Sequence, residues 1–265
     1  GAIGFKQFFR DNIKLKMNTQ STKLITLTNN GYLEMTENLL ISMKKIGIEQ
    51  MLKIYCIGSE SYTYLKKKFP MNEIELVDTN NEKLTSWVEY RSLQHPDVEG
   101  KQLWASITSY KMYAINQELI KGNDVIFTDG DIVFERNPIP YIFDNIDDKL
   151  ELLIQNDEQT LKTANMCTGF FWMRSNKNTI EITNFKTIVD NIQHFSNDQQ
   201  YMRRFSNKIN HKYLDLDLFP NGKYYRDNIP KAIIIHFNYD VSNQKIRRMK
   251  QFKKWYIEKV VACED

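Results

Sequence analysis

The sequence predicts an α/β fold in which helices flank a mostly parallel central sheet, as in Rossmann-like domains. Short apolar segments rich in β-branched residues alternate with longer segments of helical periodicity. A strand, a helix and a second strand in this order form a parallel pair with a right-handed crossover. The 265 residues are enough for one large domain with its own core. We therefore expect residues 1–22 to be a lead-in and residues 23–265 to form a single domain.

The expected strands are short and are bounded by turn-forming residues. The first alternates apolar and polar side chains and ends at an Asn-Asn-Gly turn, whereas the fourth has an apolar Val-Ile-Phe centre and is expected to be buried. The strands that we expect span residues 23–28, 51–57, 74–77, 124–128, 132–134, 150–154, 169–174 and 232–237.

The expected helices carry apolar residues three and four positions apart. In the third of them Ile107, Tyr110 and Ala114 share one face, and Gly122 follows at the position of a C-terminal cap. The helices that we expect span residues 34–45, 61–69, 106–121, 180–192 and 244–261. Residues 79–105 show no clear period.

Composition and charge limit the classes of partner. The net charge of +3 does not require a nucleic-acid partner, and we expect none. The three cysteines are far apart and form no C-x-x-C pair, which favours a reducing compartment, so we expect a cytoplasmic protein. No apolar run reaches the roughly 18 residues of a membrane span, and the start lacks the apolar segment of a signal peptide. Because Gly1 replaces an initiating Met, a fragment of a membrane-anchored protein of the secretory pathway is the alternative.

Two carboxylates follow the buried strand at residues 124–128, and they point to a metal site. Asp129 and Asp131 lie two positions apart at the carboxyl end of this strand, where open α/β sheets bind their ligands. Two such carboxylates repel one another unless a cation lies between them, and Gly130 leaves room for a bulky group near the backbone. The alternative is a polar turn with no function.

The same segment fits a second class of enzyme. A strand followed by Asp-x-Asp-x-Val resembles the first motif of the haloacid-dehalogenase phosphatases, in which the first Asp would be a nucleophile. That class also needs a later acidic pair, and the candidate considered is Asp147-Asp148, the adjacent pair of aspartates. It follows the first motif too closely, so this alternative is the weaker one.

Several further blocks, in a fixed order from Leu24 to Trp255, support the metal-site interpretation. They read LITLTNNGY at 24–32, KGNDVIFTDGDIVFERNP at 121–138, CTGFFWMRS at 167–175, NDQQ at 197–200, FPNG at 219–222 and HFN at 236–238, followed by a basic helix at 248–255. Together they resemble the nucleotide-diphospho-sugar transferase family, retaining glycosyltransferases of the GT-A fold that include plant-type α-xylosyl- and arabinosyltransferases. The resemblance implies a nucleotide-binding half at about 23–135 and an acceptor and catalytic half at about 136–265.

The resemblance also implies the metal ligands. Asp129 is similar to the family residue that meets both donor ribose and metal, Asp131 to the direct metal ligand, and His236 to the third protein ligand. A neutral imidazole beside two carboxylates suits manganese, with magnesium as the alternative. Without this context, His236 would more often be a core or surface histidine.

Four other residues are implied to bind the nucleotide-sugar. Thr28 and Asn29 end the first strand, where the family places the nucleoside, although plain polarity at a strand end is the alternative. Lys111, one helix before the metal strand, would meet donor phosphate or sugar, unless it is an exposed helix lysine. Lys245 would bind the diphosphate, unless it belongs to a solvated basic helix face.

The catalytic candidates lie later in the chain. Asp198 and Gln199 match an acidic-Gln pair that lies beneath the donor's anomeric carbon in relatives, where retention needs a nucleophile or electrostatic support. Asp198 could instead be only a helix cap. Asp157 is a second carboxylate candidate, for sugar hydroxyls. Cys167 departs from the family pattern, because an Asn usually precedes the Thr-Gly-Phe sequence.

From this we expect a metal-dependent, retaining transfer of a hexose or pentose from a UDP-sugar to the hydroxyl of a glycan, protein or small-molecule acceptor. A catalytically silent module that binds a sugar-nucleotide or a glycan on the same fold is the competing hypothesis. The presence of Asp129, Asp131 and His236 argues against it.

Overall fold

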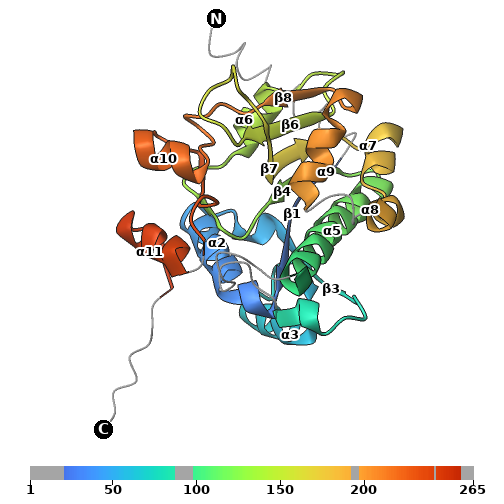
Figure 1. The fold of residues 1–265 in the computed structure, drawn as a ribbon. Coiled ribbons are helices and arrows are strands. Elements are labelled where there is room, and N and C mark those ends of the chain that lie inside the picture. The colour runs from blue at the N-terminus through green and yellow to red at the C-terminus, as the bar shows by residue number, and fades with distance from the viewer. Residues whose placement is uncertain (1–20, 87–97, 192–196, 242, 258–265) are drawn as a thin grey trace, which may run out of the picture.

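A seven-stranded mixed sheet forms the centre of the molecule, with the strand order β3-β2-β1-β4-β7-β6-β8, and β5 pairs with β9 in a separate small sheet (Figure 1). The computed structural model describes residues 21–86, 98–191, 197–241 and 243–257. The strands are β1 (Thr22–Asn29), β2 (Leu52–Ile57), β3 (Ile74–Val77), β4 (Asp124–Thr128), β5 (Ile132–Phe134), β6 (Leu152–Asn156), β7 (Met166–Met173), β8 (His211–Tyr213) and β9 (Ile234–His236).

The sheet is mostly parallel, as the sequence predicts. Strand β1 pairs in parallel with both β2 and β4, and β2 pairs in parallel with β3. Strand β7 is antiparallel to both of its neighbours, β4 and β6, and β8 returns parallel to β6. All eight expected strands are present within two or three residues of their predicted bounds, whereas the short strand β8 was not predicted.

Helices cover both faces of this sheet. They are α2 (Leu33–Lys45), α3 (Ser59–Lys68), α4 (Lys83–Ser86), α5 (Val98–Ile120), α6 (Ile139–Asp144), α7 (Lys177–Ile182), α8 (Phe185–Asn191), α9 (Asp198–Arg204), α10 (Gly222–Asn228) and α11 (Asn243–Gln251), with 3-10 turns at Asn30–Tyr32, Glu49–Met51 and Ser206–Lys208. Figure 1 shows α5, α7, α8 and α9 grouped on one side of the sheet and α2 on the other. No helix in the residues that the structure describes has both the length and the apolar composition needed to cross a bilayer.

Three of the predicted helices differ from the structure, and one of them, α5, begins at Val98, eight residues before its predicted start. The expected helix at 180–192 is two helices, because the backbone bends at Thr183 and the side chain of Asn184 accepts a hydrogen bond from Thr187 N, which caps the start of α8. The expected helix at 244–261 ends at Gln251. Lys253 there adopts a left-handed φ of 58° and Lys254 N donates to Met249 O, which closes the helix. Residue 192 of the helix expected at 180–192 and residues 258–261 of the helix expected at 244–261 lie outside the described part of the chain.

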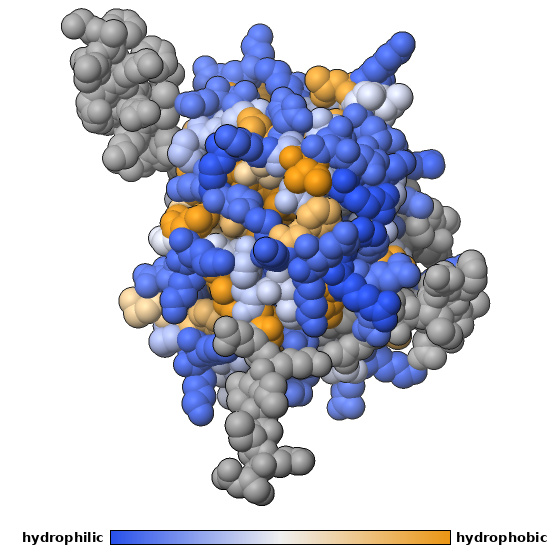
Figure 2. Space-filling view, turned by 90° about the vertical axis from the view of Figure 1, so that its left-hand side faces the viewer, coloured by the Kyte–Doolittle hydropathy of each residue, from blue (hydrophilic) through white to orange (hydrophobic). Residues whose placement is uncertain are grey.

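Apolar side chains form a core on each face of the sheet. On one face, residues of α5, α7, α8 and α9 pack against β1, β4 and β7. On the other face, α2, α3 and α6 cover the alternate side chains of the same strands. The surface over α2, α10 and α11 is largely hydrophilic with scattered apolar residues (Figure 2), as expected for a solvated face of a globular protein.

The order of the strands determines where a ligand can bind. From β1 the chain continues to β2 and β3 on one side, and then returns to place β4 on the other side of β1. The crevice at the carboxyl ends of β1 and β4 is therefore a topological switch point, the usual place for a ligand in such sheets.

Candidate active site

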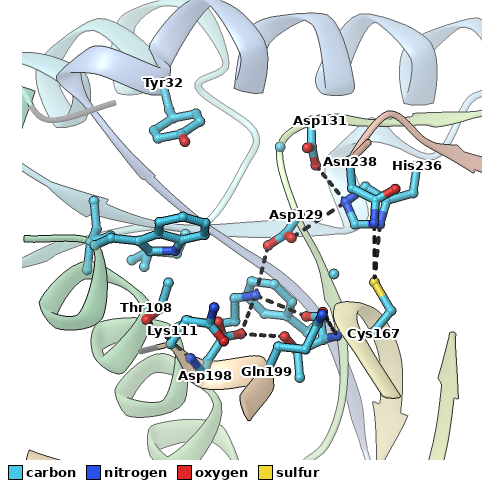
Figure 3. A pocket seen from close by; sticks show the side chains of 18 of the residues that line it. Tyr32, Thr108, Lys111, Asp129, Asp131, Cys167, Asp198, Gln199, His236 and Asn238 are labelled. Atoms are coloured by element: carbon cyan, nitrogen blue, oxygen red, sulfur yellow. Dashed lines mark hydrogen bonds and ion pairs between the residues drawn. The ribbon is translucent and has the colours of Figure 1, made fainter. Parts of the chain in front are cut away.

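A pocket of about 420 Å³ opens at this switch point. Its walls come from the carboxyl ends of β1 and β4, from α5, from β7, from the start of α9 and from the segment after β9 (Figure 3). It is lined by all of the predicted site residues, namely Thr28, Asn29, Lys111, Asp129, Asp131, Asp157, Asp198, Gln199, His236 and Lys245. Residues separated by more than 200 positions in the sequence therefore share one cavity.

The three predicted metal ligands lie together at one end of the pocket. Asp129 and Asp131 follow β4, and the antiparallel pairing of β5 with β9 places His236 opposite Ile132, next to Asp131. Nε2 of His236 lies 3.0 Å from Oδ1 of Asp131 and 3.7 Å from Oδ2 of Asp129. One potential ligand atom from each of the three residues lies within 4.8 Å of the others.

This cluster fits a divalent cation. Oδ1 of Asp131 is buried, and no donor in the described part of the chain is aligned for a hydrogen bond to it; a buried carboxylate oxygen of this kind needs a partner. Gly169 of β7 lies so close that a Cβ there would be 2.1 Å from Cε1 of His236 and 2.9 Å from Oδ2 of Asp129. Two carboxylates and one imidazole are a donor set that suits Mn²⁺ or Mg²⁺.

Neighbouring charges and burial shift the pKa values of Asp129, Asp131 and His236 in different directions. Burial alone would raise the pKa of Asp131, but Lys245 and His236 hold it well below its usual range. Burial also raises the pKa of Asp129, against the opposing charge of Lys111 and with the support of the Asp131 carboxylate. Burial opposes protonation of His236, yet the Asp131 carboxylate keeps the pKa of His236 well above its usual value. The site is therefore one where cations are stabilised.

Lys245 and Lys111 are both buried, so neither is the exposed helix lysine of the alternative interpretations. Nζ of Lys245, on α11, lies 2.7 Å from Oδ2 of Asp131. Nζ of Lys111, on α5, lies 3.1 Å from Oδ1 of Asp129 and 2.7 Å from Oδ2 of Asp198. These pairs raise the pKa of Lys111 even though burial opposes it. Lys111 therefore stays charged in the pocket. Contact of either lysine with a ligand stays a prediction.

Asp198 and Gln199 lie at the first turn of α9. Asn197 caps that helix by accepting a hydrogen bond from Gln200 N, so Asp198 is not the cap and the alternative role proposed for it is wrong. Asp198 instead accepts a hydrogen bond from the hydroxyl of Thr168. Oε1 of Gln199 lies 3.3 Å from Thr168 N.

Asp157 is held by three donors, which sequence reasoning did not foresee. Its Oδ2 accepts hydrogen bonds from Arg203 at 3.0 Å and from Nε2 of Gln199 at 3.2 Å, and its Oδ1 accepts one from Nδ2 of Asn238 at 3.0 Å. Arg203 and Asn238 were missed as site residues. Asn238 belongs to the HFN block, and Arg203 lies one helical turn after Gln199, so both carried a weak signal in the sequence. Asp157 thus orients Gln199 as well as lining the pocket.

The side chains of Thr28 and Asn29 form hydrogen bonds that shape the turn after β1. The hydroxyl of Thr28 accepts a hydrogen bond from Thr36, and Asn29 donates to Leu84 O and accepts from Tyr32 N. Both residues still line the pocket, and the ring of Tyr32 stands above it (Figure 3). The fold places them where the nucleoside was expected, and their contact with it stays a prediction.

Comparison with known proteins gives a consistent result. The sequence model of the nucleotide-diphospho-sugar transferase family matches residues 77–249. The chain is also 27% identical over 298 positions to UDP-galactose:fucoside alpha-3-galactosyltransferase of Dictyostelium discoideum, an alignment that covers 92% of this chain and 44% of that protein. The chain thus spans less than half the length of this curated relative.

Three solved structures with the same fold are distant in sequence. The galactosyltransferase LgtC, in complex with donor and acceptor sugar analogs, superposes with a TM-score of 0.55 at 9% identity, over 89% of this chain and 98% of LgtC. A glycosyltransferase involved in glycosylation of the major capsid of PBCV-1 gives 0.53 at 9% identity, over 88% and 99%. Mouse xyloside xylosyltransferase 1 gives 0.51 at 12% identity, over 83% and 99%. These similarities identify the GT-A fold, as the sequence predicts.

Proposed function

The chain belongs to the nucleotide-diphospho-sugar transferase family, a family of glycosyltransferases, and we propose that it is a metal-dependent, retaining member that moves a sugar from a UDP-sugar to an acceptor hydroxyl. The observation that carries the proposal is the cluster of Asp129, Asp131 and His236 at the end of the pocket. A sugar- or nucleotide-binding module without activity would not need two carboxylates and an imidazole converging on one point.

The donor proposal rests on the site and on one relative. That relative's name states UDP-galactose as the donor and an alpha linkage in the product. In this chain Asp129, Asp131 and His236 would hold Mn²⁺ or Mg²⁺, which when bound would neutralise charge on the diphosphate leaving group. The ammonium group of Lys245, 2.7 Å from Asp131, is near enough to contact the same diphosphate.

The sugar is expected on the side of the pocket formed by α9. Asp198, Gln199 and Asp157 face the cavity there. Thr168 donates hydrogen bonds to both Asp198 and Gln199, and Gln199 donates one to Asp157. As the bond between anomeric carbon and diphosphate breaks, positive charge develops on the sugar ring, and carboxylate and amide oxygens stabilise such charge. The acceptor, which we expect to be a glycan, a protein or a small molecule, would supply the hydroxyl oxygen for the new bond.

The phosphatase alternative finds no support in the fold. Asp147, half of the Asp147-Asp148 pair, is exposed and accepts hydrogen bonds from the backbone of Lys149 and Leu150. Neither Asp147 nor Asp148 lines the pocket. The second carboxylate pair that this chemistry needs is therefore not supplied by these residues.

The direct test is hydrolysis of UDP-sugars in the absence of acceptor, with the released UDP as the measured product. We expect slow turnover of at least one UDP-sugar with Mn²⁺ or Mg²⁺, and none after chelation. Asp131→Asn keeps the size of the side chain and removes its charge, and it should abolish metal-dependent UDP binding in calorimetry. Turnover of p-nitrophenyl phosphate instead would favour the phosphatase, and metal-dependent UDP binding without turnover with any acceptor would favour the silent module.

A further inference from the structure

Behind the metal-ligand cluster, His236 makes a buried contact that sequence reasoning did not single out. Nδ1 of its ring lies 2.8 Å from Oε1 of Gln155, a residue of β6. Both side chains are almost completely buried. The thiol of Cys167 lies near the same ring nitrogen, at 3.6 Å, and a thiol is the weaker hydrogen-bond partner of the two.

The other end of the Gln155 amide determines which atom faces the histidine. Nε2 of Gln155 lies 3.1 Å from Phe219 O and 3.1 Å from Pro220 O. Backbone carbonyls only accept hydrogen bonds, so the NH₂ group must face them and the carbonyl oxygen must face the ring. The assignment of the amide follows from its neighbours.

This orientation has a consequence for the ring of His236. Because Oε1 of Gln155 can only accept, Nδ1 of His236 must carry the hydrogen. In the neutral imidazole the lone pair is then on Nε2, the atom that faces Asp131 and Asp129. That is the tautomer that a metal ligand requires.

We propose that Gln155 is a positioning residue, which fixes the tautomer and the ring plane of His236 so that Nε2 is presented to the cation. This inference rests on the metal site of the proposed function. The backbone supports it: the register of β6 against β7 shifts between Ile154 and Gln155, and irregularities of this kind redirect side chains next to active sites.

The test uses Gln155→Met, which keeps the length of the side chain and removes both ends of the amide. Mn²⁺ affinity is measured by electron paramagnetic resonance in the presence of UDP, and UDP affinity without metal by calorimetry. We expect Mn²⁺ to bind about 10- to 100-fold more weakly, while metal-free UDP affinity stays at the wild-type value. Gln155→Asn shortens the side chain by one methylene, so its amide no longer reaches His236, and it should show the same loss. This variant replaces Gln155→Met in the experiment if Gln155→Met does not fold.

Asn116→Leu is the matched control. The amide of Asn116 is also buried and also has two acceptors, Ile180 O and the hydroxyl of Thr183, but it lies between α5 and α7, away from the pocket. It should lower the melting temperature and leave Mn²⁺ affinity unchanged. A spectroscopic readout separates positioning from stability. In wild-type protein without metal, at a pH where His236 is neutral, ¹⁵N NMR should show the hydrogen on Nδ1, and in Gln155→Met this tautomer should no longer predominate.

Two results would overturn the inference in distinguishable ways. A folded Gln155→Met or Gln155→Asn protein with wild-type Mn²⁺ affinity would remove the role of Gln155 and leave the proposed function in place. Wild-type protein that takes up no Mn²⁺ with UDP would refute the metal site itself, and the inference with it.

Discussion

Gly169 shows how a single missing side chain shapes the site. A Cβ at this position would lie 2.1 Å from Cε1 of His236, so Gly169→Ala must displace the imidazole or β7. We expect the metal-dependent affinity for UDP to fall more than about 10-fold. Displacing a metal ligand should weaken metal binding at least as much as removing the hydrogen-bond partner behind that ligand. Calorimetry with and without Mn²⁺ measures this change.

Gly122→Ala is the control for that substitution. Gly122 has a φ of 86°, and a Cβ there would meet no heavy atom within 4 Å, so alanine costs only the left-handed strain of about 1–2 kcal/mol. It should reduce the free energy of unfolding and leave Mn²⁺ affinity intact. An equal loss of affinity in both variants would mean that Gly169 acts only through stability.

Gln199 is the residue whose role depends most on the proposed mechanism. Its amide is fixed between Thr168 N and Asp157, a rigid placement suited to stabilising charge that develops on the sugar. Gln199→Ala should lower kcat by on the order of 10²-fold and leave the donor KM nearly unchanged, as for an interaction made mainly in the transition state. The exposed neighbour Gln200→Ala is the control. NMR of the first-formed product should show the donor's anomeric configuration, and an inverted product would exclude retention.

At the residue scale, the sequence is informative where a motif and a strand end coincide. Asp129 and Asp131 follow an apolar strand directly, so their place could be predicted from periodicity alone. Gln155 could not, because the shift in register before it breaks the alternation from which side-chain direction is inferred. The triple hydrogen bonding of Asp157 also depends on partners from α9 and from the segment after β9, which no local pattern specifies.

Helix α5 is the element that connects the parallel strands to the α9 side of the pocket. Its Lys111 forms ion pairs with Asp129 after β4 and with Asp198 at the start of α9, and also donates to Thr168 O of β7. One buried ammonium group thereby fixes three other elements. Without it, burial of the Asp198 carboxylate and partial burial of Asp129 would be costly.

Lys111→Met should therefore affect both stability and binding. Removing one partner of a buried ion pair costs about 3–5 kcal/mol, which urea unfolding would detect, and the affinity for the UDP-sugar should fall as Asp129 and Asp198 lose their common partner. Lys101→Met, at an exposed position of the same helix, should leave both quantities within experimental error. A stable Lys111→Met protein with unchanged donor affinity would contradict the assignment.

At the element scale, strands were predicted more accurately than helices. The bounds of β3, β4 and β5 agree with the prediction to the residue, because turn-forming residues on both sides limit short apolar segments. Helix α5 begins eight residues before the predicted start at Ser106, in a stretch with no clear apolar period. Its early turns are determined by tertiary packing, which overrides local propensity.

At the scale of the whole molecule, the pocket lies at one end of the parallel strands and a buried charge cluster lies near the other. Nζ of Lys53, at the start of β2, is 2.7 Å from Oε1 of Glu118 near the end of α5, and Lys53 also pairs with Glu73 and Glu75 of the β3 segment. This cluster joins the helix that carries Lys111 to the sheet. None of its residues lines the pocket, so stability can be tested there separately from activity.

Glu118 makes the stability of the whole domain depend on pH. Burial alone would raise the pKa of its carboxyl, but hydrogen bonds from Lys53, Tyr55 and Asn123 outweigh burial and lower the pKa from 4.5 to about 2. A carboxyl whose folded pKa is depressed stabilises the fold above its unfolded pKa and loses that contribution as pH falls toward its folded pKa. Glu118→Gln should thus be clearly less stable than wild type at pH 7, and the gap should narrow between about pH 5 and pH 2. Urea unfolding at several pH values measures this gap, with exposed Glu60→Gln as the control. A gap that stayed constant down to about pH 3 would show that Glu118 contributes through shape and not through its charge.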